Sequence, residues 1–322
     1  MPRDEPATAE DREEKMDITV VIPLFNEAES LRELHERIVA ALEASGKSFE
    51  VLFIDDGSRD GSFEAIRRLR DSDDRVRAIR FRRNYGKSAA LAVGFEASRG
   101  EVVVTMDADL QDDPAEVPAM VDLLEEGFDL VSGWKKSRKD PLSKRIPSKL
   151  FNRVTGIVSG LRLHDFNCGL KAYRRAVVET IPVYGELHRY LPVLAHWAGF
   201  RVTETPVLHH PRKHGQSKFG LGRFTHGFFD LLTVYFVSNY TRRPLHLFGS
   251  FGLLSFVAGV GIALYLTWLW LAGVGIGTRP LLLFSVFLMV LGIQLVSMGL
   301  IAEMIAHQAR RTEDYAVRER LG

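Results

Sequence analysis

Cysteine is almost missing from this chain: among its 322 residues, only Cys168 carries a thiol. A single cysteine cannot form an internal disulfide, which excludes a disulfide-stabilised secreted domain and indicates a reducing compartment. A large excess of one charge is also missing, because the formal net charge is +1. Bulk electrostatic binding of nucleic acid is therefore not expected.

Two motifs of other protein classes are missing as well. No G-x-G-x-x-G segment follows the first expected strand, which argues against a dinucleotide fold of the dehydrogenase kind. The N-terminus lacks the basic and then apolar pattern of a signal peptide. Residues 1–17 are acidic and polar, and we predict that they form a disordered tail.

Charged side chains nearly disappear from residues 245–302, where Arg279 is the only Lys, Arg, Asp or Glu. Two apolar runs, over about 245–274 and 280–302, each exceed the roughly 20 residues that cross a bilayer core. A pair of buried helices in a soluble protein is the alternative, but such helices rarely lack charge for so long. We predict a transmembrane hairpin over residues 244–306.

The basic residues around the hairpin predict its orientation. Arg242 and Arg243 precede the first run, and Arg310 and Arg311 follow the second, whereas the connecting loop holds one arginine. The positive-inside rule then places both termini and the rest of the chain in the cytoplasm, as an integral inner-membrane protein. Before the hairpin, residues 219–243 are expected to form an interfacial amphipathic helix, with a core helix as the alternative. After the hairpin, residues 307–322 are expected to form a cytoplasmic tail.

Upstream of the hairpin, strand and helix patterns alternate. Strands are expected over residues 18–25, 50–55, 76–81, 101–107 and 129–133, and helical spacing is clearest over residues 29–45 and 62–71. This alternation predicts an α/β domain with a mostly parallel, doubly wound sheet, and we assign residues 18–218 to it. Ligands of such sheets bind outside the carboxyl ends of the strands, where polar clusters follow the first, second and fourth strands here.

One of these clusters, TMDADLQDDP at residues 105–114, holds four aspartates in ten residues. Asp107 ends an expected strand and Asp109 follows two residues later, so both carboxylates can point at one ion. Hard oxygen ligands suit Mg²⁺ or Mn²⁺, and Mg²⁺ commonly completes its shell with substrate phosphates. Gln111 adds a neutral oxygen as a candidate ligand. A solvated acidic loop is the alternative, since a lone D-x-D is common.

Helix capping explains other carboxylates in these clusters. Asp112 and Asp113 precede a proline and are interpreted as the N-cap of the next helix. The cluster DDGSRDGS at residues 55–62 fits a glycine-rich turn that caps a helix. It fits equally a site where Asp55 or Asp56 accepts hydrogen bonds from a nucleobase or a ribose.

Taken in order, the segments VIPLFNE, FIDDGSRDGS, RNYGKSAALAVGF and DADLQDDP resemble the nucleotide-binding half of family 2 glycosyltransferases, which have the GT-A fold. The segments DFNCGLKAYRR, ELHRYLPVLAHWAGFRVTETPV and RKHGQSKFG resemble the polyprenyl-phosphate branch of that family. This branch includes dolichyl-phosphate mannose synthases and bacterial undecaprenyl-phosphate glucosyltransferases, and the resemblance covers roughly residues 18–240. The Q-x-x-R-W motif of processive cellulose and hyaluronan synthases is absent, which favours transfer of a single sugar.

The resemblance implies roles for particular residues. It implies a donor-binding set of Pro23, Phe25, Asn26, Glu27, Asp55, Asp56, Lys87, Asp107, Arg212, Ser217 and Lys218. It implies Mg²⁺ or Mn²⁺ as cofactor on Asp107, Asp109 and Gln111. It implies an acceptor-phosphate set of Lys144, Arg145 and Ser148, although the family more often has arginine where Lys144 stands. The expected catalytic residues are Asp109, which would steer the nucleophile, Lys144 and Arg145.

Two further groups of residues are candidates for other roles. The candidates for the wall of the sugar pocket are Trp134, His188 and Arg189. The histidines His209, His210 and His214 suggest zinc, but no cysteine or carboxylate has ligand spacing there, so solvated loop histidines are expected.

These features together predict an inverting transfer of one sugar from a nucleoside diphosphate sugar, with UDP-glucose favoured, to a polyprenyl phosphate. The alternatives are a GDP-mannose-dependent polyprenyl-phosphate mannose synthase, a transferase that acts on a lipid sugar or a diacylglycerol, and a non-catalytic membrane protein that binds nucleotide sugars. The expected partners are the nucleotide sugar, the polyprenyl phosphate and the bilayer, without nucleic acid. A second copy of the chain, in a homo-oligomer, is a further candidate partner.

Overall fold

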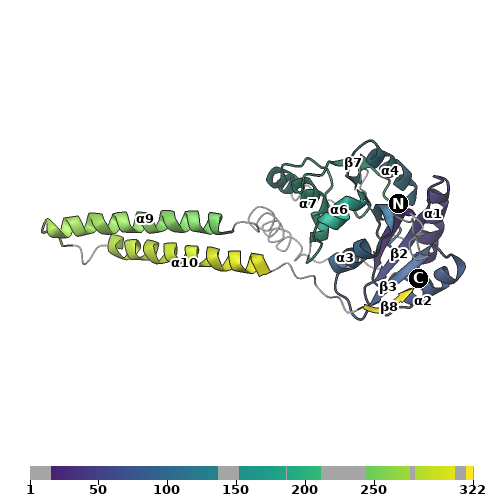
Figure 1. Ribbon diagram of the computed structural model, residues 1–322, viewed down its shortest axis with the longest axis horizontal. Helices are drawn as coiled ribbons and strands as arrows, with labels where there is room; N and C mark the ends of the chain where they lie inside the picture. The colour runs from purple at the N-terminus through teal and green to yellow at the C-terminus, as the bar shows by residue number, and fades with distance from the viewer. Residues whose placement is uncertain are drawn as a thin grey trace, which may run out of the picture. The chain divides into compact units, whose positions relative to one another are not determined.

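The computed structural model describes residues 16–136, 152–185, 187–211, 244–275, 280–308 and 317–321. The chain divides into two units, one of Met1–Leu231 with Tyr315–Gly322 and one of Leu232–Asp314. In the described residues, the first unit is an α/β sheet with helices, and the second consists of two long helices (Figure 1).

The sheet of the first unit has eight strands among the described residues, in the order β7-β5-β6-β4-β1-β2-β3-β8. Their bounds are β1 Met16–Leu24, β2 Phe49–Asp55, β3 Val76–Phe81, β4 Gly100–Thr105, β5 Leu130–Trp134, β6 Lys171–Arg174, β7 Val202–Pro206 and β8 Val317–Leu321. The four central strands, β4, β1, β2 and β3, run parallel, as the alternation predicted. In contrast, β6 runs antiparallel to both β4 and β5, so the sheet is mixed.

Helices cover both faces of this sheet (Figure 1). One face packs against α1 (Leu31–Glu43), α2 (Ser62–Ser72) and α4 (Val117–Glu125), and the other against α3 (Lys87–Ala97) and α6 (Arg175–Thr180). The remaining short helices are η2 (Pro114–Glu116), η3 (Leu187–Arg189), α7 (Leu191–Trp197) and a helix over residues 152–159. On α1, the predicted apolar stripe is buried, since Leu31, Leu34 and Ile38 are at most 1% exposed. Burying each such side chain contributes about 1.5–3 kcal/mol.

The second unit pairs α9 (Pro244–Leu271) with α10 (Pro280–Gln308). Both are long and apolar enough to cross a membrane, over Leu247–Leu271 and Pro280–Ala302, and only 11% of each span is buried. Such exposure argues against core helices of a soluble protein. Glycines allow the two backbones to approach closely, because a Cβ on Gly252 would lie 2.7 Å from the backbone oxygen of Gly292.

Two chain segments differ from the prediction. β1 begins at Met16, inside the predicted tail, because Asp17 and Ser48 exchange hydrogen bonds of 3.0 and 2.9 Å that fix its start beside β2. Residues 317–321, inside the predicted C-terminal tail, form β8 and pair antiparallel with β3. The pairing covers an edge of the sheet that would otherwise present free N–H and C=O groups. The interfacial helix predicted over 219–243 lies outside the described residues.

Candidate active site

The loops that follow β1 and β2 are bonded to each other at the carboxyl edge of the sheet. The backbone N–H of Asn26 donates to Ser58 Oγ at 2.8 Å, and Asn26 Oδ1 accepts from the N–H of Arg59 at 2.8 Å. The N–H of Glu27 donates to Ser62 Oγ at 3.0 Å. Asn26 has a φ of 57°, a left-handed conformation that asparagine tolerates better than most residues. Two segments predicted to hold the nucleotide therefore form one structure.

Asp55 and Asp56 are buried and engaged within the protein. Asp55 Oδ2 lies 3.2 Å from Nε of Arg80. Asp56 accepts the backbone N–H groups of Tyr85 at 2.6 Å and Gly86 at 2.9 Å, which orders the loop between β3 and α3. Burial raises the pKa of Asp56, although the two N–H donors oppose this. The structure thus gives both aspartates an organising role, and direct contact of either with a nucleotide stays a prediction.

Residues 106–113, here called the aspartate loop, follow β4 directly. Leu110 has a φ of 60°, an uncommon conformation for a leucine that costs about 1–3 kcal/mol. The turn brings the backbone N–H of Gln111 within 3.2 Å of Asp109 Oδ1. Strain of this kind persists where the surrounding structure holds it, and it is concentrated at functional sites.

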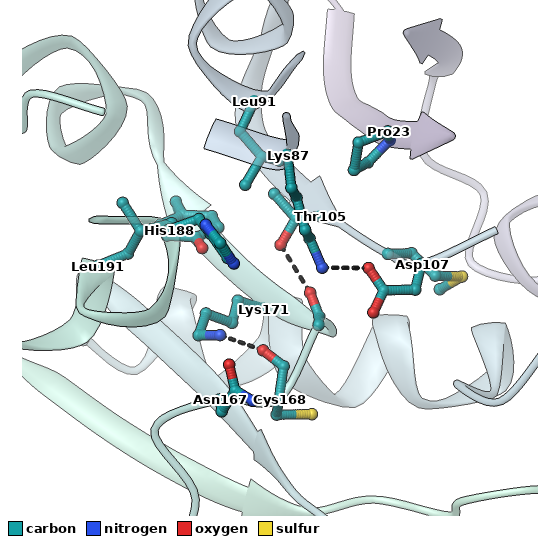
Figure 2. Close-up of a pocket in the computed structure, with 13 residues that line it drawn as sticks. Pro23, Lys87, Leu91, Thr105, Asp107, Asn167, Cys168, Lys171, His188 and Leu191 are labelled. Carbon is teal, nitrogen blue, oxygen red and sulfur yellow. Dashed lines mark hydrogen bonds and ion pairs between the residues drawn. The ribbon is translucent and has the colours of Figure 1, made fainter. Parts of the chain in front are cut away.

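Asp107 forms an ion pair with Lys87, the first residue of α3 (Figure 2). Burial opposes ionisation of Asp107, but the ammonium group of Lys87 outweighs this effect and lowers the pKa of Asp107 to about 2. The carboxylate is therefore charged at neutral pH. Both side chains are about a third exposed, which leaves them accessible to a ligand.

The surroundings of Asp107 fit the predicted divalent metal. A Cβ on Gly169 would lie 2.6 Å from Asp107 Oδ2, so a glycine at this position leaves room for the carboxylate. Across the described ranges, no group of three or more His, Cys, Asp or Glu side chains could hold an ion unaided. Asp107 and Asp109 stay the predicted carboxylate ligands, and two carboxylates would suit an ion that shares its ligands with a diphosphate. Gln111, the third predicted ligand, is half-buried.

The next two aspartates have different roles. Asp113 Oδ1 accepts from the N–H of Ala115 at 3.1 Å and caps η2, as predicted. The capping role predicted for Asp112 is wrong, because Asp112 is fully buried and lies 2.8 Å from Nζ of Lys135. A β-bridge between Asp112 and His209 turns this residue inward, beside the end of β5. Burial opposes the charge of Lys135, but Asp112 raises the pKa of that lysine.

A cavity of about 20 Å³ adjoins Asp107 (Figure 2). It is lined by three residues of the predicted donor set, Pro23, Lys87 and Asp107, and by one candidate for the sugar-pocket wall, His188. The other two candidates, Trp134 and Arg189, do not line it, and the ring of Trp134 stacks on that of His164 at 4.1 Å. The structure thus brings the start of α3, the aspartate loop and η3 together around one space.

His188 is held in a defined orientation by Ser88 of α3. Nδ1 of the ring lies 2.9 Å from Ser88 Oγ, and the backbone N–H of His188 donates to the same oxygen at 3.2 Å. Ser88 thus contacts both the ring and the backbone of His188 and fixes the position of the imidazole. Burial keeps the pKa of His188 well below its usual value, so the ring is neutral at pH 7.

Sequence reasoning missed Lys171, which lines the same cavity and is 3% exposed. Its Nζ donates to the backbone oxygen of Cys168 (Figure 2). Lys171 pairs in register with Thr105, the last residue of β4, so the reversed direction of β6 is what brings it to the carboxyl edge. The only signal in the sequence is its place in the DFNCGLKAYRR segment.

Several predicted residues lie outside the described residues. They are the acceptor set Lys144, Arg145 and Ser148, the donor residues Arg212, Ser217 and Lys218, and one of the three histidines, His214. Of the other two histidines, His210 has its Nε2 2.9 Å from Oδ2 of Asp113. The two sets of phosphate contacts therefore remain predictions.

Relatives of the chain act on lipid phosphates. It is 38% identical over 315 residues to a dodecaprenyl-phosphate galacturonate synthase of Rhizobium johnstonii, which covers 95% of this chain and 93% of the relative. It is 39% identical over 291 residues to an undecaprenyl-phosphate 4-deoxy-4-formamido-L-arabinose transferase of Pseudomonas paraeruginosa, which covers 89% and 84%.

A solved structure shares the fold of the first unit. This is glucosyl-3-phosphoglycerate synthase from Mycobacterium tuberculosis in complex with Mn²⁺, UDP-glucose and phosphoglyceric acid, with a TM-score of 0.54 and 18% identity over 68% of this chain and 79% of that chain. The likeness supports the GT-A fold that the motifs implied. Residues 19–182, about half of the chain, match the family model described as glycosyl transferase family 2. The chain belongs to glycosyl transferase family 2, and it is a glycosyltransferase whose relatives transfer sugars to polyprenyl phosphates.

Proposed function

We propose that the chain transfers one sugar from a nucleoside diphosphate sugar to a polyprenyl phosphate and inverts the anomeric carbon. The observation that carries the proposal is the Lys87–Asp107 ion pair at the carboxyl edge of the sheet, where Gly169 leaves room for the Asp107 carboxylate. The relatives support the acceptor class, because two polyprenyl-phosphate sugar transferases align over most of this chain.

At the donor, Asp107 and Asp109 would hold Mg²⁺ or Mn²⁺, which stabilises negative charge on the departing diphosphate when bound. Asp107 is already ionised, so no proton has to leave before the metal arrives. Lys87 shares that carboxylate in the structure. With a divalent ion on Asp107, the Lys87 ammonium would be free to bind a phosphate oxygen of the donor.

The long apolar helices α9 and α10 explain how a water-insoluble acceptor reaches this site. They associate the enzyme with the membrane in which a polyprenyl chain resides. We propose that residues 219–243 lie at the bilayer surface and that the catalytic unit and both termini are cytoplasmic. The acceptor phosphate would then meet Lys144, Arg145 and Ser148.

We favour UDP over GDP as the leaving group. The loops of the proposed base site pack closely, since a Cβ on Gly57 would lie 2.7 Å from the backbone carbon of Arg83. This close approach holds the loops after β2 and β3 together beside the proposed base site. Glucose stays our prediction for the transferred sugar. UDP-glucose and GDP-mannose are the two donors to compare first in a transfer assay.

A transfer assay tests the proposal. Purified full-length chain in lipid nanodiscs would be mixed with undecaprenyl phosphate and each nucleotide sugar, and the lipid product would be identified by mass spectrometry. We expect a lipid-phosphate-linked monosaccharide to form, and we expect no product when EDTA is present from the start of the reaction. Donor binding without any product would show a non-catalytic binding protein, and product formed only on diacylglycerol or a lipid sugar would show a different acceptor class.

A further inference from the structure

The cavity beside Asp107 contains buried hydrogen-bond donors with unused capacity. Tyr173 is 0% exposed, and its hydroxyl group has no hydrogen-bond partner among the described residues. The Lys171 ammonium has three N–H donors, and its one hydrogen bond within the described residues goes to the backbone oxygen of Cys168. Buried donors without acceptors destabilise a fold, and native proteins rarely retain them without a reason. A ligand that supplies acceptors would satisfy these donors.

The strand geometry places both donors on one side. Lys171 and Tyr173 are two residues apart on β6, so their side chains leave the same face of the sheet, and both line the cavity. Each lies beside β4, in register with Thr105 and Val103. The hydroxyl of Thr105 donates its proton to the backbone oxygen of Gly169 at 2.9 Å, so it offers only its lone pairs to its neighbours.

The size of the cavity limits what can enter it. About 20 Å³ is room for roughly one water molecule, so a sugar ring does not fit, whereas a single small substituent of a sugar does. Asp107 lines the same cavity, and the proposed function places the diphosphate on that residue. The ring that is bonded to the diphosphate would then lie at the mouth, with one substituent pointing inward.

The chemistry of the wall selects among substituents. A hydroxyl group both donates and accepts, whereas a carboxylate only accepts and has two oxygens for two donors. Burial lowers the pKa of Lys171, and a bound carboxylate would favour its charged form, which a neutral group does not. We propose that this cavity binds a carboxylate on the transferred sugar through Lys171 and Tyr173, so that the preferred donor is a nucleoside diphosphate uronic acid. The inference rests on the proposed function and names its sugar class.

Matched donors test this inference. Each pair differs only in a carboxylate or a hydroxymethyl group at the sixth carbon: UDP-galacturonate with UDP-galactose, UDP-glucuronate with UDP-glucose, and GDP-mannuronate with GDP-mannose. With the full-length chain in nanodiscs and undecaprenyl phosphate, we expect at least one acidic donor to have a kcat/KM about tenfold to a hundredfold above that of its neutral partner. This is the ratio that one charged hydrogen bond typically provides.

Variants link the preference to the cavity. Lys171→Met keeps the length of the side chain and removes its charge, so it should lower kcat/KM for the acidic donor about tenfold to a hundredfold and change the neutral donor less than about threefold. Tyr173→Phe removes only the unpartnered hydroxyl, so it should reduce the same preference without unfolding the protein. Lys47→Met is the matched control, because Lys47 pairs with Glu125 on the surface and lies away from the cavity.

Three results would overturn the inference. Neutral donors used as well as their acidic partners would mean that the cavity holds only water. Equal losses for both members of a pair in both variants would give Lys171 and Tyr173 a purely structural role. A higher KM for undecaprenyl phosphate, the same with every donor, would assign Lys171 to the acceptor phosphate. If no donor reacts, the proposed function fails, and calorimetric binding of each matched pair still decides whether the carboxylate is recognised.

Discussion

Replacing Asp107 with asparagine tests the centre of the site. Asp107→Asn keeps the size of the side chain but removes the charge that would hold the metal and that pairs with Lys87. We expect transfer to fall by about a hundredfold or more, because a neutral amide is a poor ligand for a hard cation. A tenfold loss would correspond to only about 1.4 kcal/mol of transition-state stabilisation.

The same substitution should change stability only modestly. The pKa of Asp107 falls from 3.8 to about 2, which bounds the contribution of its charge at about 2.5 kcal/mol. Both partners are about a third exposed, so solvent screening reduces this to about 1 kcal/mol. A depressed pKa stabilises the fold above about pH 4, and the contribution is lost as the pH falls toward 2. Asp107→Asn should therefore lower Tm by about 2–4 °C at pH 7.

Kinetics and thermal unfolding on the same preparations separate the two effects. Asp113→Asn is the control, because Asp113 lies in the same loop but caps η2, and an asparagine side chain can also cap. That variant should keep transfer within about twofold of the wild type. If Asp107→Asn retained more than a tenth of wild-type transfer with Mg²⁺ or Mn²⁺, the assignment of Asp107 as a metal ligand would be wrong.

Three other changes have definite expected outcomes. Lys135→Met leaves Asp112 buried without its partner and should lower the free energy of unfolding by about 3–5 kcal/mol, as denaturant titration would show, whereas adding Asp112→Asn should recover part of this loss. Deleting residues 309–322 removes β8, so Tm should fall and light scattering should report more aggregation through the edge of β3, while unchanged values would deny β8 a structural role. Alanine at Arg212 or Lys218 should raise the KM for the donor about tenfold to a hundredfold, and alanine at Lys144 or Arg145 should raise the KM for the lipid phosphate by the same factor. The division between two phosphate sites is wrong if all four variants affect the KM of one substrate only.

The sequence predicted the central sheet because local pattern determines it. Apolar runs bounded by polar turns mark β1 to β4, and the observed strands lie within two residues of the predicted bounds. The site loops were predictable for the same reason, since carboxyl ends of parallel strands meet at one edge. The hairpin was predictable from composition alone, as α9 and α10 begin within one residue of the predicted apolar runs.

What could not be predicted depends on contacts between distant residues. The pairing of Asp112 with Lys135 is set by a bridge to His209, almost a hundred residues further along the chain, whereas the local pattern of two aspartates before a proline reads as a cap. The role of β8 depends on a free edge at β3 that no local pattern reveals. Lys171 reaches the site only because β6 runs against its neighbours, and the sequence predicted a mostly parallel sheet.

The neutral state of His188 bears on how the proposed acceptor is activated. A histidine beside a reacting centre suggests a general base, which needs a pKa near the working pH. Burial holds the pKa of His188 well below that range, and Nδ1 of the ring is engaged with Ser88 Oγ at 2.9 Å. A lipid monophosphate does not need a base, since its second pKa near 6 leaves it largely dianionic at neutral pH. The nucleophile instead has to approach a negatively charged donor, and cationic side chains reduce the repulsion between them.

The pH profile of transfer should therefore follow ionisation of the acceptor phosphate near pH 6. It should keep that shape in His188→Gln, which retains a hydrogen-bond donor but cannot titrate. A profile whose acidic limb disappears in this variant would instead show that His188 accepts a proton during the reaction.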